Sequence, residues 1–362
     1  MRPQALPGFV RQHLSATIGL AVLAFAVLWV IVGANVVEAF GSDPLTTLGG
    51  ISSAANDPQT FISVVLNGIT LAGIYFIVAS GFTLIFGLMR IVNMAHGTLF
   101  LLGFYIAYEL VNGGRICVVG CLPHTSGTTW VGALFISSAI VGVLGLVMQQ
   151  VFLRWNQGQD LRQAIITIAI SLVVADQMIE DYGGLAAKQL NIPKVFDTTF
   201  PIYAYGLQYP LFRAFVLGVA VFVGLLLFLI IKRTRFGMIV RAGVDDRAMV
   251  STLGINIQLV FAAAFLAGSF LASLGGVFAG TAFSLGPGDD GKYLLSALIV
   301  VIIGGMGSLG GAAIGAIAYG LVDQLSSVYL PFEWSPYSII LTFVLLVFIL
   351  VVRPLGLFGR PA

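Results

Sequence analysis

Long runs of apolar residues, joined by short polar segments, limit most strongly how this chain folds. The run from Leu211 to Ile231 contains a single charged residue, Arg213. About 20 apolar residues are enough to cross the hydrocarbon core of a membrane as a helix. The chain is 59% hydrophobic and only 9% charged, whereas soluble domains are about 25% charged. Because the runs are continuous rather than alternating, they indicate helices and exclude a barrel. We therefore predict an all-α integral membrane protein.

The number of runs predicts a polytopic bundle of about ten transmembrane helices. They lie at residues 14–40, 61–86, 98–111, 130–153, 163–179, 211–231, 259–283, 293–303, 312–329 and 337–352. We divide the chain into an N-terminal helix with its external loop (1–60) and a main transmembrane domain (61–362). The first run is longer than a usual signal-peptide core, which favours an uncleaved helix. Val37-Glu38-Ala39 is similar to a cleavage site, so whether residues 1–40 are removed stays open.

The distribution of basic residues predicts the orientation. With the N-terminus inside, twelve of the seventeen lysines and arginines fall in cytoplasmic segments, as the positive-inside rule requires. Both termini are then cytoplasmic. The same orientation puts the segment Lys232–Gln258 in the cytoplasm, where its basic residues set it apart from the other loops. These are Lys232, Arg233, Arg235, Arg241 and Arg247.

Two glycine-containing segments, Gly87–Gly97 and Gly304–Gly311, each interrupt an apolar hairpin. Unwound backbone at membrane depth must line protein or a water-filled cavity. In transporters, paired interruptions in the two halves of the chain indicate the substrate pathway. The alternative is that both are ordinary tight cytoplasmic turns. The candidates for a substrate pathway are Asn67, Asn93, His96, Gly97, Gly304, Gly305 and Gly307.

Several other functions find no support in the sequence. His96 has no second ligand at metal spacing, so we predict no metal site. Residues 286–292 fit the pattern GxxxxGK, but Tyr293 replaces the Ser or Thr that a phosphate loop needs. We therefore expect this chain to bind no ATP or other cofactor. We also expect no nucleic acid partner, because basic residues are not clustered with aromatic ones, and no enzyme activity, because no catalytic constellation is present.

The remaining polar residues of the apolar segments have simpler explanations. Asp323 and the acidic end of the fifth run lie near the outer interface, where solvation costs little. The stripe of small residues at Gly268, Ala272, Gly276 and Gly280 predicts close helix packing. Cys117 and Cys121 fall in a loop predicted to be external. They are candidates for a disulfide in an oxidising compartment, and two unpaired thiols are the alternative.

Four motifs stand out, in this order: GLMRIVNMAHG with the following LFLLGFY, RFGMIVRAGVDDRAMVSTLGINIQLV, ALIVVIIGGMGSLGGAAIGAI and the ending RPLGLFGRP. Together they resemble the permeases of branched-chain (hydrophobic) amino acid ABC importers. The resemblance covers about Leu66 to Pro361. Residues 1–60 add a span that shorter members lack, and Thr98 stands where many members have Glu.

The resemblance implies a transmembrane permease subunit of an ATP-binding cassette importer in the bacterial inner (plasma) membrane. It implies four partners: a second permease, two ATP-binding subunits that carry ATP, and a periplasmic substrate-binding protein. Branched-chain or other hydrophobic amino acids are the implied substrates, with urea, short amides and aromatic acids as alternatives. Whether the second permease is a homologue or another copy stays open, and a stand-alone secondary transporter is a further alternative.

The resemblance also identifies the segment 232–258 as the contact with an ATPase subunit. The residues implied in coupling are Phe236, Gly237, Arg241, Ala242, Asp245, Asp246, Ala248, Leu253, Gly254 and Ile255.

Overall fold

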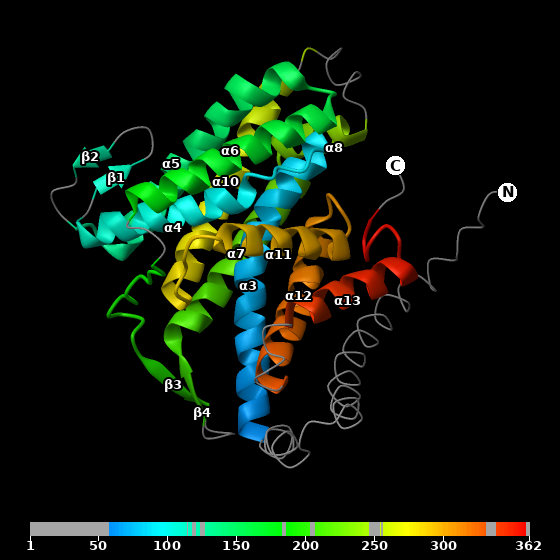
Figure 1. Ribbon diagram of the computed structural model, residues 1–362. Helices are drawn as coiled ribbons and strands as arrows, with labels where there is room; N and C mark the ends of the chain where they lie inside the picture. Colours follow the sequence, from blue (N-terminus) through cyan, green and yellow to red (C-terminus); the bar gives the residue numbers. More distant parts are fainter. Residues whose placement is uncertain are drawn as a thin grey trace.

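The computed structural model describes residues 58–113, 115–117, 121–123, 127–182, 186–202, 207–245, 254, 256–330 and 338–359. The predicted helix at 14–40 lies outside these residues. Helices dominate the described part of the chain (Figure 1). They are α3 (Pro58–Met89), α4 (His96–Asn112), α5 (Trp130–Met148), α6 (Asp160–Asp181), α7 (Leu211–Arg233), α8 (Arg235–Asp245), α10 (Ile257–Ala282), α11 (Asp289–Gly304), α12 (Leu309–Tyr329) and α13 (Ser338–Val352). Two short turns, η1 (Gln149–Leu153) and η2 (Arg154–Asn156), extend α5.

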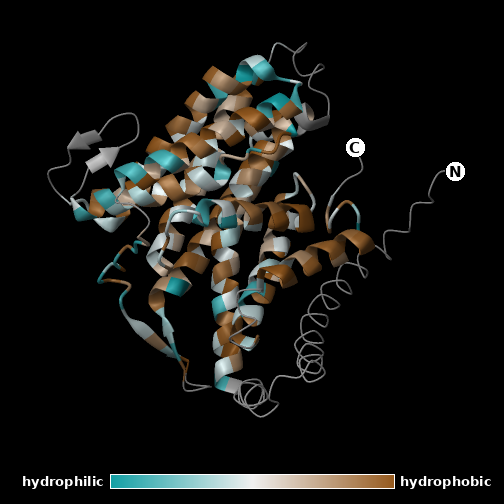
Figure 2. Cartoon of the chain, in the orientation of Figure 1, coloured by the Kyte–Doolittle hydropathy of each residue, from teal (hydrophilic) through white to brown (hydrophobic). Residues whose placement is uncertain are grey.

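The chain is an all-α membrane protein. Five of the described helices are long and apolar enough to cross a membrane, or six if the bent pair α11 and α12 forms one span. Helix α13 is apolar but shorter, and Figure 2 shows hydrophobic residues along its whole length. Helix α4, predicted as a full span, has 17 residues, most of them buried within the protein. Its interior position follows from its packing against α5, α10 and α11.

Helix α10 lies at the centre and packs against α3, α4 and α5. A Cβ atom built on Gly268 would lie 2.9 Å from the carbonyl oxygen of Gly81 in α3, and one on Gly276 would lie 2.0 Å from that of Phe100 in α4. Neither site has room for a side chain. The glycine stripe therefore brings backbones together where lipid provides no hydrophobic driving force, as predicted.

A short hairpin lies against the N-terminal ends of α3 and α7. Strands β3 (Thr199–Ile202) and β4 (Leu207–Pro210) pair antiparallel. The phenol of Tyr209 donates to the carbonyl oxygen of Leu66 at 3.1 Å and is hydrogen bonded to Thr70, both in α3. Burial raises the pKa of Tyr209, so it remains a neutral donor at physiological pH. A second hairpin, β1 (Arg115–Cys117) with β2 (Cys121–Pro123), follows α4 and sets Cys117 directly opposite Cys121.

Candidate functional site

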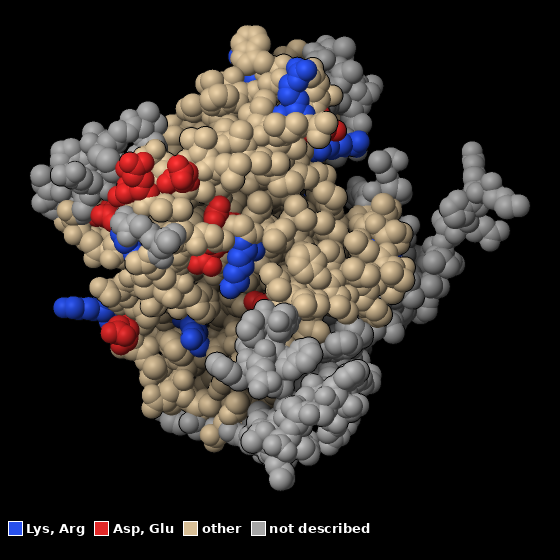
Figure 3. Space-filling view, viewed as in Figure 1, with Lys and Arg blue, Asp and Glu red and all other residues tan. Residues whose placement is uncertain are grey.

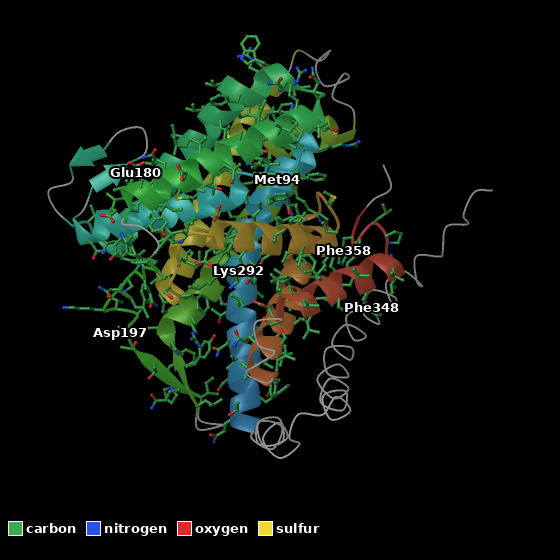
Figure 4. The ribbon with its side chains drawn as sticks, in the orientation of Figure 1. Met94, Glu180, Asp197, Lys292, Phe348 and Phe358 are labelled. Carbon is green, nitrogen blue, oxygen red and sulfur yellow. The ribbon has the colours of Figure 1, made fainter. Side chains whose placement is uncertain are left out.

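The chain leaves helical structure at residues 90–95, the first break, and at residues 305–308, the second break. At the first break, Arg90 adopts a left-handed φ of 56° and its N–H donates to the carbonyl oxygen of Phe86 at 2.8 Å, which closes α3. The side chain of Asn93 then accepts from the N–H of Ala95 at 3.1 Å, and the N–H of Met94 donates to Thr167 of α6 at 3.2 Å. The first break is thus a structured turn, bound to a neighbouring helix, and Figure 4 labels Met94 within it.

His96 and Gly97 begin α4 and hold it against other helices. The His96 ring is fully buried, with Nε2 hydrogen bonded to the carbonyl oxygen of Val78 at 3.0 Å and its edge against Phe82. A Cβ atom built on Gly97 would lie 2.1 Å from the carbonyl oxygen of Asp290, at the start of α11. These contacts give His96 and Gly97 a structural role in packing α4. Their contact with substrate stays a prediction. Asn67 lies near the opposite end of α3, far from the first break, and accepts a hydrogen bond from Arg213 of α7.

Helix α8 packs against the end of α3, and its buried side chains belong to the same cluster as residues of the first break. Val240 is buried in a cluster with Leu88 and Met89 at the end of α3 and with Ile91 and Ala95 of the break itself. Phe236 and Ile239 of α8 are partly buried against the same cluster. Displacement of α8 must therefore disturb the residues that shape this turn, because close-packed side chains transmit strain.

Glycine holds α8 close to the end of α7. A Cβ atom built on Gly237 would lie 2.2 Å from the carbonyl oxygen of Ile231 and 2.4 Å from that of Ile230. The Thr234 hydroxyl accepts from the N–H of Gly237 at 3.2 Å and so caps α8. The change of direction between α7 and α8 therefore depends on these two residues.

The predicted coupling residues are described only in part. Phe236, Gly237, Arg241, Ala242 and Asp245 belong to α8, and Ala242 is exposed. Gly254 lies in a turn, with φ 77°. Asp246, Ala248, Leu253 and Ile255 lie outside the described residues.

The end of α3, just before the first break, meets the second break at a pair of glycines. A Cβ atom built on Gly87, in the last turn of α3, would lie 3.4 Å from the Cα atom of Gly307 in the second break. Gly305 and Gly307 have φ values of 96° and 83°, which L side chains rarely adopt. At this break the chain turns by 119° between α11 and α12. The segments that the sequence singled out are therefore in contact, although about 220 residues separate them.

The C-terminal segment closes the end of α11. The N–H groups of Leu357 and Phe358 donate to the carbonyl oxygens of Ile303 and Gly304 at 2.9 and 3.0 Å. The last carbonyl groups of a helix have no partner within it. Leu357 and Phe358 therefore satisfy backbone groups that the second break would otherwise leave unpaired, and Figure 4 labels Phe358 beside this turn.

A cluster of polar aromatic residues lies farther along the same hairpin. The Tyr75 hydroxyl of α3 donates to the Asp323 carboxylate of α12 at 3.2 Å, and Ser296 of α11 is hydrogen bonded to Tyr319 of α12 at 2.8 Å. The Tyr75 ring packs edge-on against Tyr319, with 4.8 Å between centroids. The position of Asp323 in the sequence predicts a solvated residue near the interface and does not indicate these partners. The sequence does hold one signal of this cluster. Three tyrosines, Tyr75, Tyr293 and Tyr319, lie within apolar helices.

Comparison with known proteins identifies the family. Residues 64–350 match the family described as "Branched-chain amino acid transport system / permease component". The permease LivH of Salmonella typhimurium is 27% identical over 307 residues, which are 83% of this chain and 96% of LivH. LivH of Escherichia coli is 28% identical over 309 residues, with the same coverage of the two chains. BraD of Pseudomonas aeruginosa is 26% identical over 308 residues, again with coverage of 83% and 96%. The names of all three describe high-affinity branched-chain amino acid transport.

The solved structure of PsaBC from Streptococcus pneumoniae in complex with Fab aligns with a TM-score of 0.43 at 10% identity. The alignment covers 78% of this chain and 89% of the PsaBC chain. The structural similarity is too low to support a conclusion. The family match extends over most of the chain, including both breaks and α8. The chain therefore belongs to the family of branched-chain amino acid transport permeases.

Proposed function

We propose that this chain is the membrane-spanning permease subunit of an ABC importer for branched-chain or other hydrophobic amino acids. The family and the substrate class in the names of LivH and BraD support this. In this proposal the chain works with a second permease, two ATP-binding subunits and a periplasmic substrate-binding protein. The chain itself binds no cofactor, and ATP is bound by the partner subunits. Urea, short amides and aromatic acids are the alternative substrates, and the names of the relatives do not favour them.

The proposed topology is a bundle of about ten transmembrane helices with two interrupted hairpins, in the inner membrane of a bacterium. Both termini face the cytoplasm, as the distribution of lysine and arginine favours. The segment 232–258 and both breaks then lie on the cytoplasmic side. The end of α11 that carries Lys292 lies on the periplasmic side.

The proposed mechanism rests on one observation, the packing of α8 against the first break. An ATPase subunit contacts α8 and the residues that follow it. Movement of α8 is passed through Val240 to the end of α3 and the first break, and from Gly87 to Gly307 and the second break. The hairpin α11–α12 then moves relative to α3. Such rocking of packed helices is a known route from a local contact to alternating access.

The test combines purification with transport. The tagged chain should co-purify with ATP-binding subunits, and reconstituted vesicles should take up L-leucine only with ATP and the binding protein. Reversing the charges of Asp245 and Asp246 should reduce uptake far more than ATP hydrolysis. A chain that purifies alone and transports L-leucine without ATP would instead be a secondary transporter, the alternative that the interrupted helices allow.

A further inference from the structure

Helix α6 turns a polar stripe toward the rest of the protein. Gln163, Thr167 and Ser171 follow one another at intervals of four residues, so they lie on one side of the helix. Gln163 and Thr167 are fully buried, and Ser171 is partly buried. The opposite side is apolar and exposed, and includes Ile165 and Leu172. Polar residues of a spanning helix that face inward meet other helices or a water-filled cavity.

Hydrogen bonds join this stripe to the first break and to α4. The N–H of Met94 donates to the Thr167 hydroxyl at 3.2 Å, and the hydroxyl oxygens of Ser171 and Thr98 lie 2.5 Å apart. The two contacts are four residues apart on each segment, so they follow each other along α6. Apart from α4, helix α6 packs mainly against the short turns η1 and η2. We call this contact the polar seam; its residues are Gln163, Thr167 and Ser171 with Asn93, Met94 and Thr98.

A carboxylate from α11 reaches the same seam. The Thr98 hydroxyl donates to the Asp290 carboxylate at 3.3 Å, and therefore accepts from Ser171. Asp289 is engaged elsewhere, because its carboxylate accepts from the N–H of Gly286 at 2.7 Å. Lys292 is exposed and, within the part of the chain that the structure describes, forms no ion pair with either carboxylate. Asp290 thus adds a negative charge with further acceptor capacity to the seam.

Buried polar atoms in and beside the seam have no hydrogen-bond partner among the described residues. They are Oε1 of Gln163, Nδ2 of Asn93 and both amide atoms of Gln149, and each of these residues is at most 1% exposed. Such atoms are costly, and in native proteins they mark places where water, an ion or a ligand binds. Gln149 begins the π-helical turn η1, which packs against α6. Turns of this kind are frequent at functional sites.

Aromatic residues close the outer end of the seam. Beyond Ser171, the buried residue on the inner side of α6 is Met178, and Tyr182 follows at the end of the helix. The Tyr182 ring stacks on Tyr105 of α4 with 5.2 Å between centroids. Figure 3 shows acidic side chains gathered at this end of the helix, where Figure 4 labels Glu180. The polar groups of the seam therefore lie behind a closed aromatic contact.

We infer that the polar seam is part of the substrate path, and that α6 separates from α4 to admit an amino acid between them. The inference rests on the proposed function and names the residues of this chain that contact the substrate. The ammonium and carboxylate groups of an amino acid need acceptors and donors when they leave water. The seam provides both, through the Asp290 carboxylate, the hydroxyls of Thr98 and Ser171, and the free amide atoms. When α6 separates, the hydrogen bonds between the hydroxyls are exchanged for hydrogen bonds to the substrate.

A disulfide across the seam tests this movement. Thr98→Cys and Ser171→Cys are combined in the complete importer, with Cys117→Ser and Cys121→Ser, and uptake of L-leucine into reconstituted vesicles is measured with ATP and the binding protein. Oxidation with copper phenanthroline should lower uptake by about tenfold or more, and dithiothreitol should restore it, because the bond holds α6 against α4. The two single-cysteine variants, oxidised in the same way, are the matched controls and should not respond.

A seam that only holds α6 in place would tolerate the bond. Loss of maleimide labelling shows that the cross-link has formed. Unchanged uptake in the cross-linked importer would therefore overturn the inference.

Thiol labelling tests whether the seam opens to water. Thr167→Cys is compared with Leu172→Cys, whose side chain is 66% exposed on the apolar side of α6. Both are made in the cysteine-free importer, in lipid nanodiscs, and treated with the water-soluble cation MTSET. Because the reactive species is the thiolate, which needs water, Thr167→Cys should react about tenfold faster during ATP-driven turnover than at rest. Leu172→Cys should react slowly in both conditions, since it faces lipid.

The outcomes separate this inference from the proposed function. If the wild-type importer takes up L-leucine while Thr167→Cys reacts no faster than Leu172→Cys, the seam is not the path and the proposed function stands. A cross-link that blocks uptake without labelling of Thr167→Cys would show a moving contact that substrate does not enter, and would also overturn the inference. If the wild-type importer takes up urea and not L-leucine, the proposed substrate is wrong, and the inference fails with it.

Discussion

Gly87 in α3 lies against Gly307 in the turn between α11 and α12, and an added Cβ atom at Gly87 would be 3.4 Å from the Cα atom of Gly307. This is an ordinary van der Waals separation, so a methyl group fits and a larger side chain does not. The contact joins the end of α3 to the second break, and the end of α3 also packs against α8. It therefore links α3 directly to the turn of the hairpin that carries Asp323.

A series of side chains at Gly87 should show this limit. Gly87→Ala should leave uptake intact and stabilise α3 slightly, by about 0.5–1 kcal/mol, because glycine is a poor helix former. Gly87→Leu should cost about 1–3 kcal/mol by overpacking and should reduce uptake. Thermal unfolding and L-leucine uptake measure the two effects. Normal uptake in Gly87→Leu would mean that the breaks do not need this contact.

Gly310 and Gly311 are neighbours with opposite surroundings. A Cβ atom on Gly311 would lie 2.0 Å from the carbonyl oxygen of Gly304, whereas one on Gly310 would meet nothing within 4 Å. Gly311→Ala should lower stability by about 1–3 kcal/mol, and Gly310→Ala should be neutral or slightly stabilising. Melting temperatures of the two purified variants give the comparison. Equal temperatures would contradict the close approach of α11 and α12.

Gly237 should be needed for coupling. Gly237→Ala places a methyl group on the carbonyl oxygens of Ile230 and Ile231 and should push α8 away from α7. We expect ATP hydrolysis to continue while uptake falls. Gly218→Ala in α7 is the matched control, because a Cβ atom there meets nothing within 4 Å. The proposed mechanism fails if uptake per ATP hydrolysed is the same in both variants.

Tyr209→Phe should destabilise the outer end of the fold without affecting the pathway. It removes the donor to Leu66 and should cost about 1–2 kcal/mol, with uptake preserved at low temperature. Burial raises the pKa of Tyr209, so the wild-type phenol contributes stability below about pH 10 that is lost as it ionises above that pH. The Tyr209→Phe variant has no phenol to ionise, so it should not show this loss of stability at high pH. Thermal unfolding between pH 7 and about pH 11 tests both statements.

Cys117 and Cys121 should be oxidised if their loop is external. Residues directly opposite in an antiparallel pair lie about 4.5–5.5 Å apart between Cα atoms, within the range of about 4.4–6.8 Å for disulfides. The backbone pairing of these two residues meets that condition. Maleimide labelling of the denatured chain should therefore require a reductant. Labelling of both thiols without reductant would support the alternative of unpaired cysteines.

The sequence predicted much of the fold for a simple reason. A membrane accepts only backbone whose hydrogen bonds are satisfied internally, so apolar length alone indicated the helices that begin near Trp130, Leu211 and Ile257. It also located both breaks, because glycine and asparagine there have no place in a continuous helix. It did not show that α4 is buried among other helices, since apolar residues facing lipid and apolar residues facing other helices look alike in sequence.

The sequence by itself determined the class of protein, its family motifs and the absence of an ATP loop in this chain. It did not show that Gly87 meets Gly307, that Leu357 and Phe358 cap α11, or that Tyr75 holds Asp323. Those contacts join positions far apart in the chain. They depend on the 119° turn at the second break and on the close packing that glycines permit. Local residue patterns predict where helices lie and how long they are. The neighbours of a buried polar group, in contrast, are determined only when the helices pack together.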